Sequence, residues 1–302
     1  MNLRLTQNAY LWAILSGLAY VLCFPRYDQP YLSILFLPLS LYAIHLLRSP
    51  KQAIGLGFLL SAMVAWGGFH WIAYVAQNFG QMPLPVAIGL VCLFCLVAAP
   101  HMVAFYLLGY FARGPVERLP LILRPFFWAA SFAFLEYLAR FLKIFPEHLG
   151  NTLIAYPSIA QAASLGGVSL LTFLPVVFGA ALFYVRKIGG RQAWGALAIT
   201  LVLIFGLRAY GEKRLAYLAA EPKELLRVGL VQHNMEEVEK IAQRTSGTNA
   251  FDQIVSRLIA KNTELASGPN KPDLLLWPET AYPLIFPTPA GSSRNWLAEG
   301  YA

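Results

Sequence analysis

The sequence has 302 residues, of which 58% are hydrophobic and only 13% are charged, and its net charge is +8. Soluble domains usually carry about 25% charged residues, yet no Asp, Glu, Lys or Arg occurs between residues 52 and 112. This excludes a soluble fold there and suits helices in lipid, each of which needs about 20 apolar residues. The basic excess does not indicate nucleic-acid binding, because residues 1–208 carry +9 and residues 209–302 carry −1.

The first two-thirds of the sequence predicts about seven transmembrane helices. The apolar stretches that predict them are residues 7–24, 30–47, 52–76, 84–111, 125–142, 165–185 and 192–209. The first stretch has no small-residue cleavage site at its end, so we expect a retained anchor and not a cleaved signal peptide. Together these stretches predict a multi-pass α-helical membrane domain over residues 1–210.

Charges in the loops predict the orientation of these helices. With the N-terminus in the cytoplasm, nine Lys and Arg residues of residues 1–208 fall on the cytoplasmic side and three on the opposite side. Cytoplasmic loops of membrane proteins carry the excess of basic residues, so we expect the N-terminus inside. Seven crossings then place everything after residue 209 outside the cytoplasm, which in a Gram-negative bacterium is the periplasm.

Glu136 and Arg140 lie one helical turn apart in the fifth predicted span. Charged residues inside a membrane are functional candidates by default. The alternative is an i,i+4 ion pair near the outer interface that only supports the helix. The sequence leaves the roles of both residues open.

Other reactive side chains in the apolar stretches have a packing interpretation. Cys92 and Cys95 form a C-x-x-C pattern, but no His or acidic partner lies near them on that segment, so helix packing is favoured over a metal or redox site. His70 and His101 lie in uncharged stretches, where hydrogen-bonded packing is favoured over ligation. The sequence therefore predicts no metal site.

The character of the sequence changes after residue 210. Residues 211–226 are predicted as a charged linker, followed by a buried strand over 227–233, a helix over 236–266 and a second buried strand over 273–277. Strand, helix, strand is the pattern of a parallel βαβ unit with a right-handed crossover. Glu279 follows the second strand, and α/β folds usually place their chemistry at the carboxyl ends of strands.

Two interpretations of Glu279 stay open on the residues alone. It is either a solvated loop carboxylate or a general base beside a buried sheet, where desolvation raises the pKa of a carboxyl group. Pro278 and Pro283 flank it and restrict the backbone on both sides, which would hold a base in place.

Four segments are similar to parts of one protein family. Leu275–Pro283 (LLWPETAYP), preceded by Val228–Asn234 (VGLVQHN), resembles the opening of a nitrilase-type, or carbon–nitrogen hydrolase, domain. Trp66–Ile72 (WGGFHWI) and Phe79–Pro85 (FGQMPLP) resemble segments of the membrane-bound branch of that superfamily, the apolipoprotein N-acyltransferases. The resemblance implies that residues 227–302 are the N-terminal portion of an α/β nitrilase-like domain, an αββα sandwich that is incomplete here.

The resemblance also implies an activity. Members of the family move an acyl chain from a phospholipid donor to the amino group of a diacylglyceryl-cysteine lipoprotein, using a Glu–Lys–Cys triad and no cofactor. A thiolate forms a thioester with the acyl chain, the glutamate deprotonates the nucleophiles, and the lysine stabilises the oxyanion. Glu279 matches the position of the catalytic glutamate. The implied location is the bacterial inner membrane.

Two departures from the family pattern matter. The catalytic Lys and the nucleophilic Cys are not present in this chain: Lys271 precedes the second strand, and the three cysteines fall in predicted spans. We therefore expect a truncated member that is inactive alone: a gene fragment, a frameshifted product, an inactive remnant, or one half of a split enzyme whose second polypeptide supplies the rest. In addition, Glu147 and His148 replace the aromatic residues that usually follow Phe145 and Pro146, which puts an acyl-pocket role for that loop in doubt.

Three alternatives are kept beside this interpretation. A membrane-tethered amidase of the same superfamily would share Glu279 and would also need a cysteine. A non-catalytic remnant would only bind lipid. A transporter would explain the helices, but it predicts internal repeats, and none is evident in the sequence.

Overall fold

The structure is a computed structural model that describes residues 8–142, 144–145, 147–220, 226–232 and 250–277. The chain divides into two compact units, Met1–Glu221 and Pro222–Ala302. Each unit is described below by itself.

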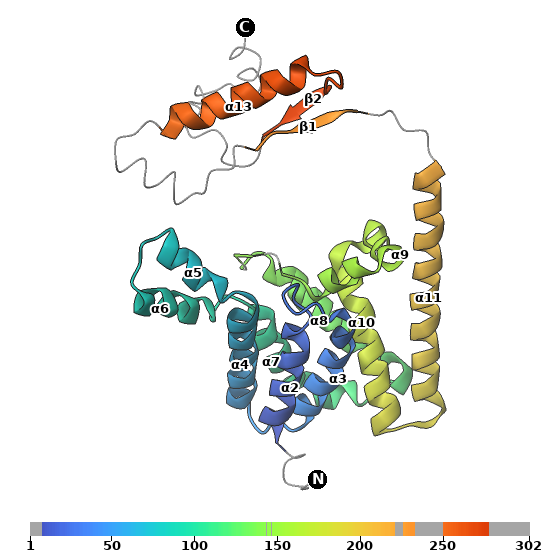
Figure 1. Cartoon of the computed structure of the whole chain (residues 1–302). Coiled ribbons are helices and arrows are strands. Elements are labelled where there is room, and N and C mark those ends of the chain that lie inside the picture. Colours follow the sequence, from blue (N-terminus) through green and yellow to red (C-terminus); the bar gives the residue numbers. More distant parts are fainter. Residues whose placement is uncertain (1–7, 143, 146, 221–225, 233–249, 278–302) are drawn as a thin grey trace, which may run out of the picture. The chain divides into compact units, whose positions relative to one another are not determined.

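The first unit is a bundle of helices (Figure 1). Its α-helices are α2 (Ala9–Val21), α3 (Ser33–His45), α4 (Pro50–Gly68), α5 (Trp71–Asn78), α6 (Leu84–Phe94), α7 (Pro100–Val116), α8 (Arg124–Ala139), α9 (Pro157–Ala160), α10 (Ala163–Lys187) and α11 (Gly190–Ala220). Three 3-10 helices, η1 (Pro30–Leu32), η2 (Leu121–Leu123) and η3 (Leu149–Ala155), join them. α4 packs against α7, α2 against α3, and α10 against both α8 and α3.

Several of these helices can cross a membrane. Three are long and apolar enough, over Leu121–Ala139, Ala163–Lys187 and Gly190–Ala220, and a fourth span results if the bent pair α4–α5 is counted as one. Shorter apolar helices cover Ala9–Val21, Pro30–His45 and Leu84–Phe94. The prediction of a helical membrane domain is confirmed, whereas the count of seven spans stays a prediction.

The stretches predicted as continuous helices over 52–76 and 84–111 are each broken in the structure. The first bends by 57° between α4 and α5, and the second is divided into α6 and α7. At the first break, a Cβ on Gly67 would lie 2.2 Å from the Val21 side chain, and one on Gly68 would lie 2.4 Å from the Phe24 ring. The two glycines thus let the end of α2 approach closely. At the second break, Pro100 begins α7 and has no N–H with which to continue a helix.

The start of the predicted linker is also corrected. α11 continues to Ala220, so the first ten residues of the segment predicted as linker, 211–226, are helical. Arg208 and Glu212 form an i,i+4 ion pair of 2.8 Å on α11, and the residues that follow are mostly good helix formers.

Glu117 joins four helices at one end of the bundle. It directly follows α7, and its carboxylate lies 3.2 Å from His45 Nε2, 3.3 Å from Arg124 Nη1 and 3.4 Å from Lys187 Nζ. Burial alone would raise the pKa of Glu117, but the hydrogen bond from His45 and the charge of Lys187 outweigh burial and lower it. This end of the bundle is therefore held by charge, whereas the interior is held by packing.

Close packing of α4 on α7 gives a direct test of the bundle. A Cβ on Gly57 would lie 2.4 Å from Val103 Cα, whereas one on Gly55 meets nothing within 4 Å. We expect Gly57→Ala to lower the free energy of unfolding by about 1–3 kcal/mol, the usual cost of overpacking. Gly55→Ala is the matched control and should be neutral or stabilising by up to about 1 kcal/mol, because alanine favours a helix over glycine. Denaturant titration of both variants in mixed micelles measures this, and equal effects would contradict the packing.

The second unit contains a parallel pair of strands with a helix between them. β1 (Val228–Leu230) pairs with β2 (Leu274–Leu276), with Val228 opposite Leu274, and α13 (Ala250–Ser267) lies between them in sequence. The predicted strand–helix–strand order and parallel pairing are confirmed. Residues 236–249 of the predicted helix lie outside the described part of the chain.

Burial of the two strands differs from the prediction. On one side of the sheet, Val231, Leu275 and Trp277 pack with Leu258 of α13. On the other side, Leu230 is 77% exposed and Leu276 is 45% exposed. The prediction of two buried strands is wrong for this face, because within the described ranges only α13 packs against the sheet, and successive side chains of a strand point to opposite faces.

Candidate functional site

The predicted base, Glu279, lies outside the described residues, as does the rest of 278–302. β2 ends at Leu276, and Trp277 follows it, with its indole Nε1 donating to Asn262 Oδ1 of α13 at 3.1 Å. The end of β2 therefore comes three residues before Glu279. Its role as a general base stays a prediction.

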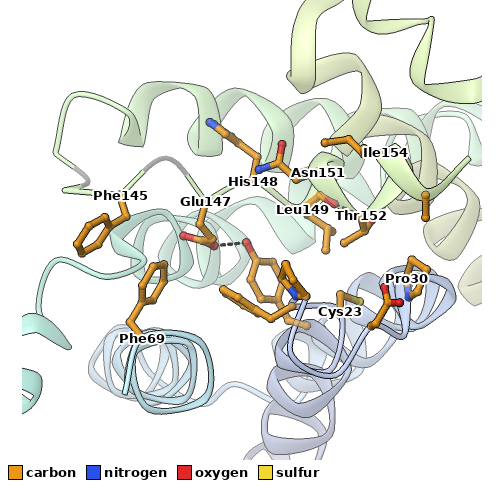
Figure 2. A pocket seen from close by; sticks show the side chains of 15 residues that line it. Cys23, Pro30, Phe69, Phe145, Glu147, His148, Leu149, Asn151, Thr152 and Ile154 are labelled. Atoms are coloured by element: carbon orange, nitrogen blue, oxygen red, sulfur yellow. Dashed lines mark hydrogen bonds between the residues drawn. The ribbon is translucent and has the colours of Figure 1, made fainter. Parts of the chain in front are cut away.

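The described residues form a different candidate site, a cavity of about 770 Å³ in the first unit (Figure 2). One wall comes from residues 20–30, at the end of α2 and in the loop that follows. The facing wall comes from residues 145–155, between α8 and the end of η3. Phe69, at the break between α4 and α5, lies beside Phe145 at one end, and Pro30 and Ile154 lie at the other. Ligand cavities commonly have 300–1,000 Å³, so this one can hold part of a lipid-sized molecule.

Two carboxylates are among the residues that line this mainly apolar cavity, together with the polar side chains of His148, Asn151 and Thr152. Glu147 accepts a hydrogen bond from the hydroxyl of Tyr20 (Figure 2), and Asp28 lies in the loop wall with a backbone φ of 51°. No Lys or Arg is among the described residues that line the cavity. The described lining thus combines apolar side chains with two carboxylates, which suits an amphiphilic ligand better than an anion.

Glu136 holds the wall formed by residues 145–155. Its side chain is fully buried, and its carboxylate accepts hydrogen bonds from Leu149 N at 2.8 Å and from Thr172 Oγ1 at 2.5 Å. His148 Nδ1 lies 3.3 Å from the same carboxylate, and Thr172 Oγ1 accepts from Gly150 N at 2.9 Å. Because these partners connect α8, η3 and α10, we refer to Glu136, His148, Leu149, Gly150 and Thr172 as the Glu136 clasp.

The expected ion pair of Glu136 with Arg140 does not form between these two described residues. Glu136 faces the clasp, whereas the guanidinium of Arg140 lies over the rings of Tyr137 at 4.0 Å and Phe141 at 4.7 Å. A cation over an aromatic face is attracted by the ring quadrupole. The local i,i+4 interpretation is therefore wrong, and Glu136 supports the cavity through residues distant in sequence.

Aromatic rings close the end of the cavity at the α4–α5 break. Phe69 stacks on Phe145 with ring centroids 5.4 Å apart, and it contacts Phe94 at 5.4 Å and Phe24 at 5.8 Å. Trp71 contacts Phe145 at 5.3 Å. Phe145 thus lies in the cavity wall as an aromatic residue, while the next described residue, Glu147, supplies a carboxylate.

The cysteines are separate free thiols in the first unit. Cys23 is buried in the cavity wall, and its Sγ donates to Ala19 O at 3.1 Å. Cys92 is exposed on α6, and Cys95 donates to Val91 O at 3.2 Å. Over the described ranges, no three His, Cys, Asp or Glu side chains come together as a metal site.

The two histidines noted in the sequence are not brought together. His70 contacts the guanidinium of Arg26 through Nε2. His101 is buried and lies edge-on to the ring of Phe132, with centroids 5.6 Å apart. Both positions are compatible with a packing role.

Sequence reasoning missed most of the cavity. Tyr20, Asp28 and Asn151 line it but carry no motif, and they are far apart in the chain. The only signal in the sequence was that Glu147 and His148 stand where aromatic residues are usual. In the structure Glu147 supplies a carboxylate to the cavity wall, and His148 belongs to the Glu136 clasp.

Comparison with known protein families identifies the family to which this chain belongs. Residues 16–182, more than half of the chain, match the model of the apolipoprotein N-acyltransferase N-terminal domain. The chain belongs to the apolipoprotein N-acyltransferase family. That match covers α3 to α9 entirely and contains every residue of the cavity.

Individual relatives agree with this assignment. A protein of Geobacter metallireducens named apolipoprotein N-acyltransferase is 31% identical over 93% of this chain and 52% of its own length. Proteins of the same name from Bdellovibrio bacteriovorus and Vibrio vulnificus are 29% and 27% identical, over 91% and 78% of this chain. This chain spans about half the length of these relatives. Membership and the apolar helices together make it a bacterial membrane protein related to acyltransferases.

Proposed function

We propose that this chain supplies the membrane domain and the first part of the catalytic domain of an enzyme that transfers an acyl chain from a phospholipid to the amino group of a diacylglyceryl-cysteine lipoprotein. The observation that carries the proposal is the family match over residues 16–182, followed in the same chain by a parallel strand pair that leads to Glu279. The family name describes the relatives' activity, and its extension to this chain is the proposal.

The cavity has the properties that an amphiphilic substrate requires. Its apolar residues provide a surface for acyl chains, whose removal from water is favourable. Its carboxylates lie among the residues at which the chain leaves α2 and enters η3. We propose that it holds part of the lipid substrate, with the Glu136 clasp fixing the wall.

Orientation is part of the proposal. The excess of Lys and Arg in alternate loops supports a cytoplasmic N-terminus in the bacterial inner membrane, with about seven crossings and a periplasmic segment after residue 220. The nitrilase-like portion, residues 227–302, would then act on the periplasmic side. The parallel pairing of β1 with β2 and the intervening helix support such a domain.

Glu279 is assigned the role of general base. In the first step a cysteine thiol gives its proton to the base, its sulfur attacks the ester carbonyl, and the lysophospholipid leaves as an alcohol after taking up the proton. In the second step the lipoprotein amine attacks the thioester and gives a proton to the base, the carbon–sulfur bond breaks, and the departing thiolate takes up that proton. These 302 residues hold no Cys after Cys95, so we propose that the Cys and Lys of the triad come from outside these residues and that residues 1–302 alone are inactive.

Acyl transfer in defined vesicles tests the proposal. The chain is reconstituted with a phospholipid carrying a fluorescent acyl chain and with a synthetic diacylglyceryl-cysteine peptide. The mass of the peptide is then followed, with and without a second polypeptide corresponding to the C-terminal half of the Geobacter relative. We expect no transfer by the chain alone and N-acylated peptide with both parts.

Three results would contradict the proposal. Transfer by the chain alone would refute the need for a partner. Hydrolysis of small amides without acyl transfer by the assembled pair would identify an amidase. Retention of fluorescent lipid with no reaction in any combination would identify a lipid-binding remnant. The gene sequence past codon 302 gives an independent check, because the proposal predicts a Lys- and Cys-bearing nitrilase segment encoded beyond these residues.

A further inference from the structure

Helices α5 and α6 leave the bundle as a hairpin. They pack on each other, α5 turns from the direction of α4 by 57°, and their main link to the bundle is through α4. Figure 1 shows both helices running across the direction of α4 and away from the remaining helices. We call residues 71–94 the α5–α6 hairpin.

The lengths of α4 and α7 place the hairpin outside the part of either helix that crosses the bilayer core. α4 has 19 residues and α7 has 17, so at a rise of 1.5 Å per residue they are about 28 and 26 Å long. The hydrocarbon core of a bilayer is about 30 Å thick. α4 and α7 therefore nearly cross the core by themselves, and the hairpin must lie near the surface where α4 ends and α7 begins.

The surface of the hairpin fits lipid. Ala87, Val91 and Phe94 are the buried residues of α6, whereas Leu84 and Val86 are each 51% exposed and Leu93 is 62% exposed. At 3.6 residues per turn Val86 and Leu93 point to one side of the helix and Leu84 points to the opposite side, so a partner on one face would not cover all three. Residues 52–112 include no charged side chain, so immersing the hairpin in lipid does not carry the free-energy cost of desolvating a charge.

The polar and aromatic residues of the hairpin fit the interface between lipid and water. Trp71 and Tyr74 are exposed on α5, and these two residue types concentrate at membrane–water interfaces. Gln77 and Asn78, at the end of α5, are also exposed. Asn78 Nδ2 donates to Tyr74 O at 2.8 Å, and the exposed amide of Gln77 suits contact with water or head groups. An amphipathic position thus suits α5, with the more apolar α6 toward the acyl chains.

We propose that the α5–α6 hairpin lies along one surface of the bilayer, immersed in lipid at the boundary of head groups and acyl chains, and does not extend the α4 and α7 spans. Its partner is the lipid leaflet itself. The rings of Phe69, Trp71, Phe94 and Phe145 join its base to the cavity wall, so the leaflet contacted by the hairpin adjoins the cavity. The inference holds for the membrane unit whether or not the chain takes part in acyl transfer.

Depth measurements at two positions on α6 test this proposal. Val86→Cys and Leu93→Cys, which lie seven residues apart and point to the same side of α6, are made separately in a chain carrying Cys92→Ser and Cys95→Ser, and the parent without an added cysteine corrects for labelling of Cys23. The full chain is placed in phosphatidylcholine–phosphatidylglycerol vesicles, and quenching of a thiol-linked fluorophore by lipids brominated at known depths gives each position. We expect both labels within about 5 Å of the same depth, 5–10 Å below the head groups.

A spanning helix provides the matched control. Trp194→Cys and Val202→Cys, on exposed sites of α11, are eight residues apart and should differ in depth by about 12 Å. If α6 continued the α7 span, its two labels would differ by about 10 Å, and this would overturn the proposal, as would labels that no lipid quenches.

Discussion

Replacing Glu136 by alanine should lower the free energy of unfolding of the membrane unit by about 2–5 kcal/mol, because each buried donor left without an acceptor costs about 1–3 kcal/mol. The reason is the number of groups left unsatisfied. Leu149 N and Thr172 Oγ1 would lose their acceptor, and His148 would lose the carboxylate 3.3 Å away. Titration with denaturing detergent in mixed micelles measures the loss.

Glu136→Gln separates charge from hydrogen bonding. An amide oxygen can still accept from Leu149 N, so we expect a smaller loss of about 1–2 kcal/mol. Limited proteolysis within 147–155 should increase in the alanine variant, because this segment forms the wall that Glu136 holds. Glu212→Gln, which removes an exposed carboxylate from α11, is the control and should change stability by less than about 0.5 kcal/mol. An alanine variant as stable as this control would refute the Glu136 clasp.

Features set by local composition were predictable from the sequence. The uncharged stretch from 52 to 112 predicted helices in lipid, and α4, α5, α6 and α7 all lie within or beside it. The switch to short apolar runs after residue 226 predicted two strands around a helix, and β1 and β2 pair in parallel as expected. In both cases the signal is periodicity or hydropathy, which neighbouring residues carry themselves.

Features set by contacts between distant residues were not predictable. Hydropathy favours a continuous helix through Gly67 and Gly68, because it takes no account of Val21 at the end of α2 and Phe24 in the loop that follows, which pack against them. The four-residue spacing offered Arg140 as one possible partner of Glu136, whereas the partners in the structure include Thr172, thirty-six residues away. The cavity is built from residues that are far apart in the sequence, so no single sequence motif predicts it.

The proposed role of Glu279 as general base can be measured directly through the rate of acyl transfer. In the assembled enzyme, this chain together with the polypeptide that supplies Lys and Cys, Glu279→Gln should lower the rate of acyl transfer by about 10²–10⁴, the usual contribution of a general base. Glutamine has nearly the same shape but cannot accept the proton of the thiol. The loss should appear already in formation of the thioester, which mass spectrometry of the cysteine-bearing polypeptide detects.

A second carboxylate of the same unit makes the measurement specific. Glu264, on α13, is exposed and pairs with Lys261 at 2.6 Å, so Glu264→Gln removes one charge without touching the predicted base. We expect this variant to retain the full rate, and we expect Glu279→Asp to recover part of the lost rate because it restores a carboxylate at a shorter reach. If Glu279→Gln and Glu264→Gln formed thioester equally fast, Glu279 would be the solvated loop carboxylate of the alternative interpretation, and the base would have to come from the second polypeptide.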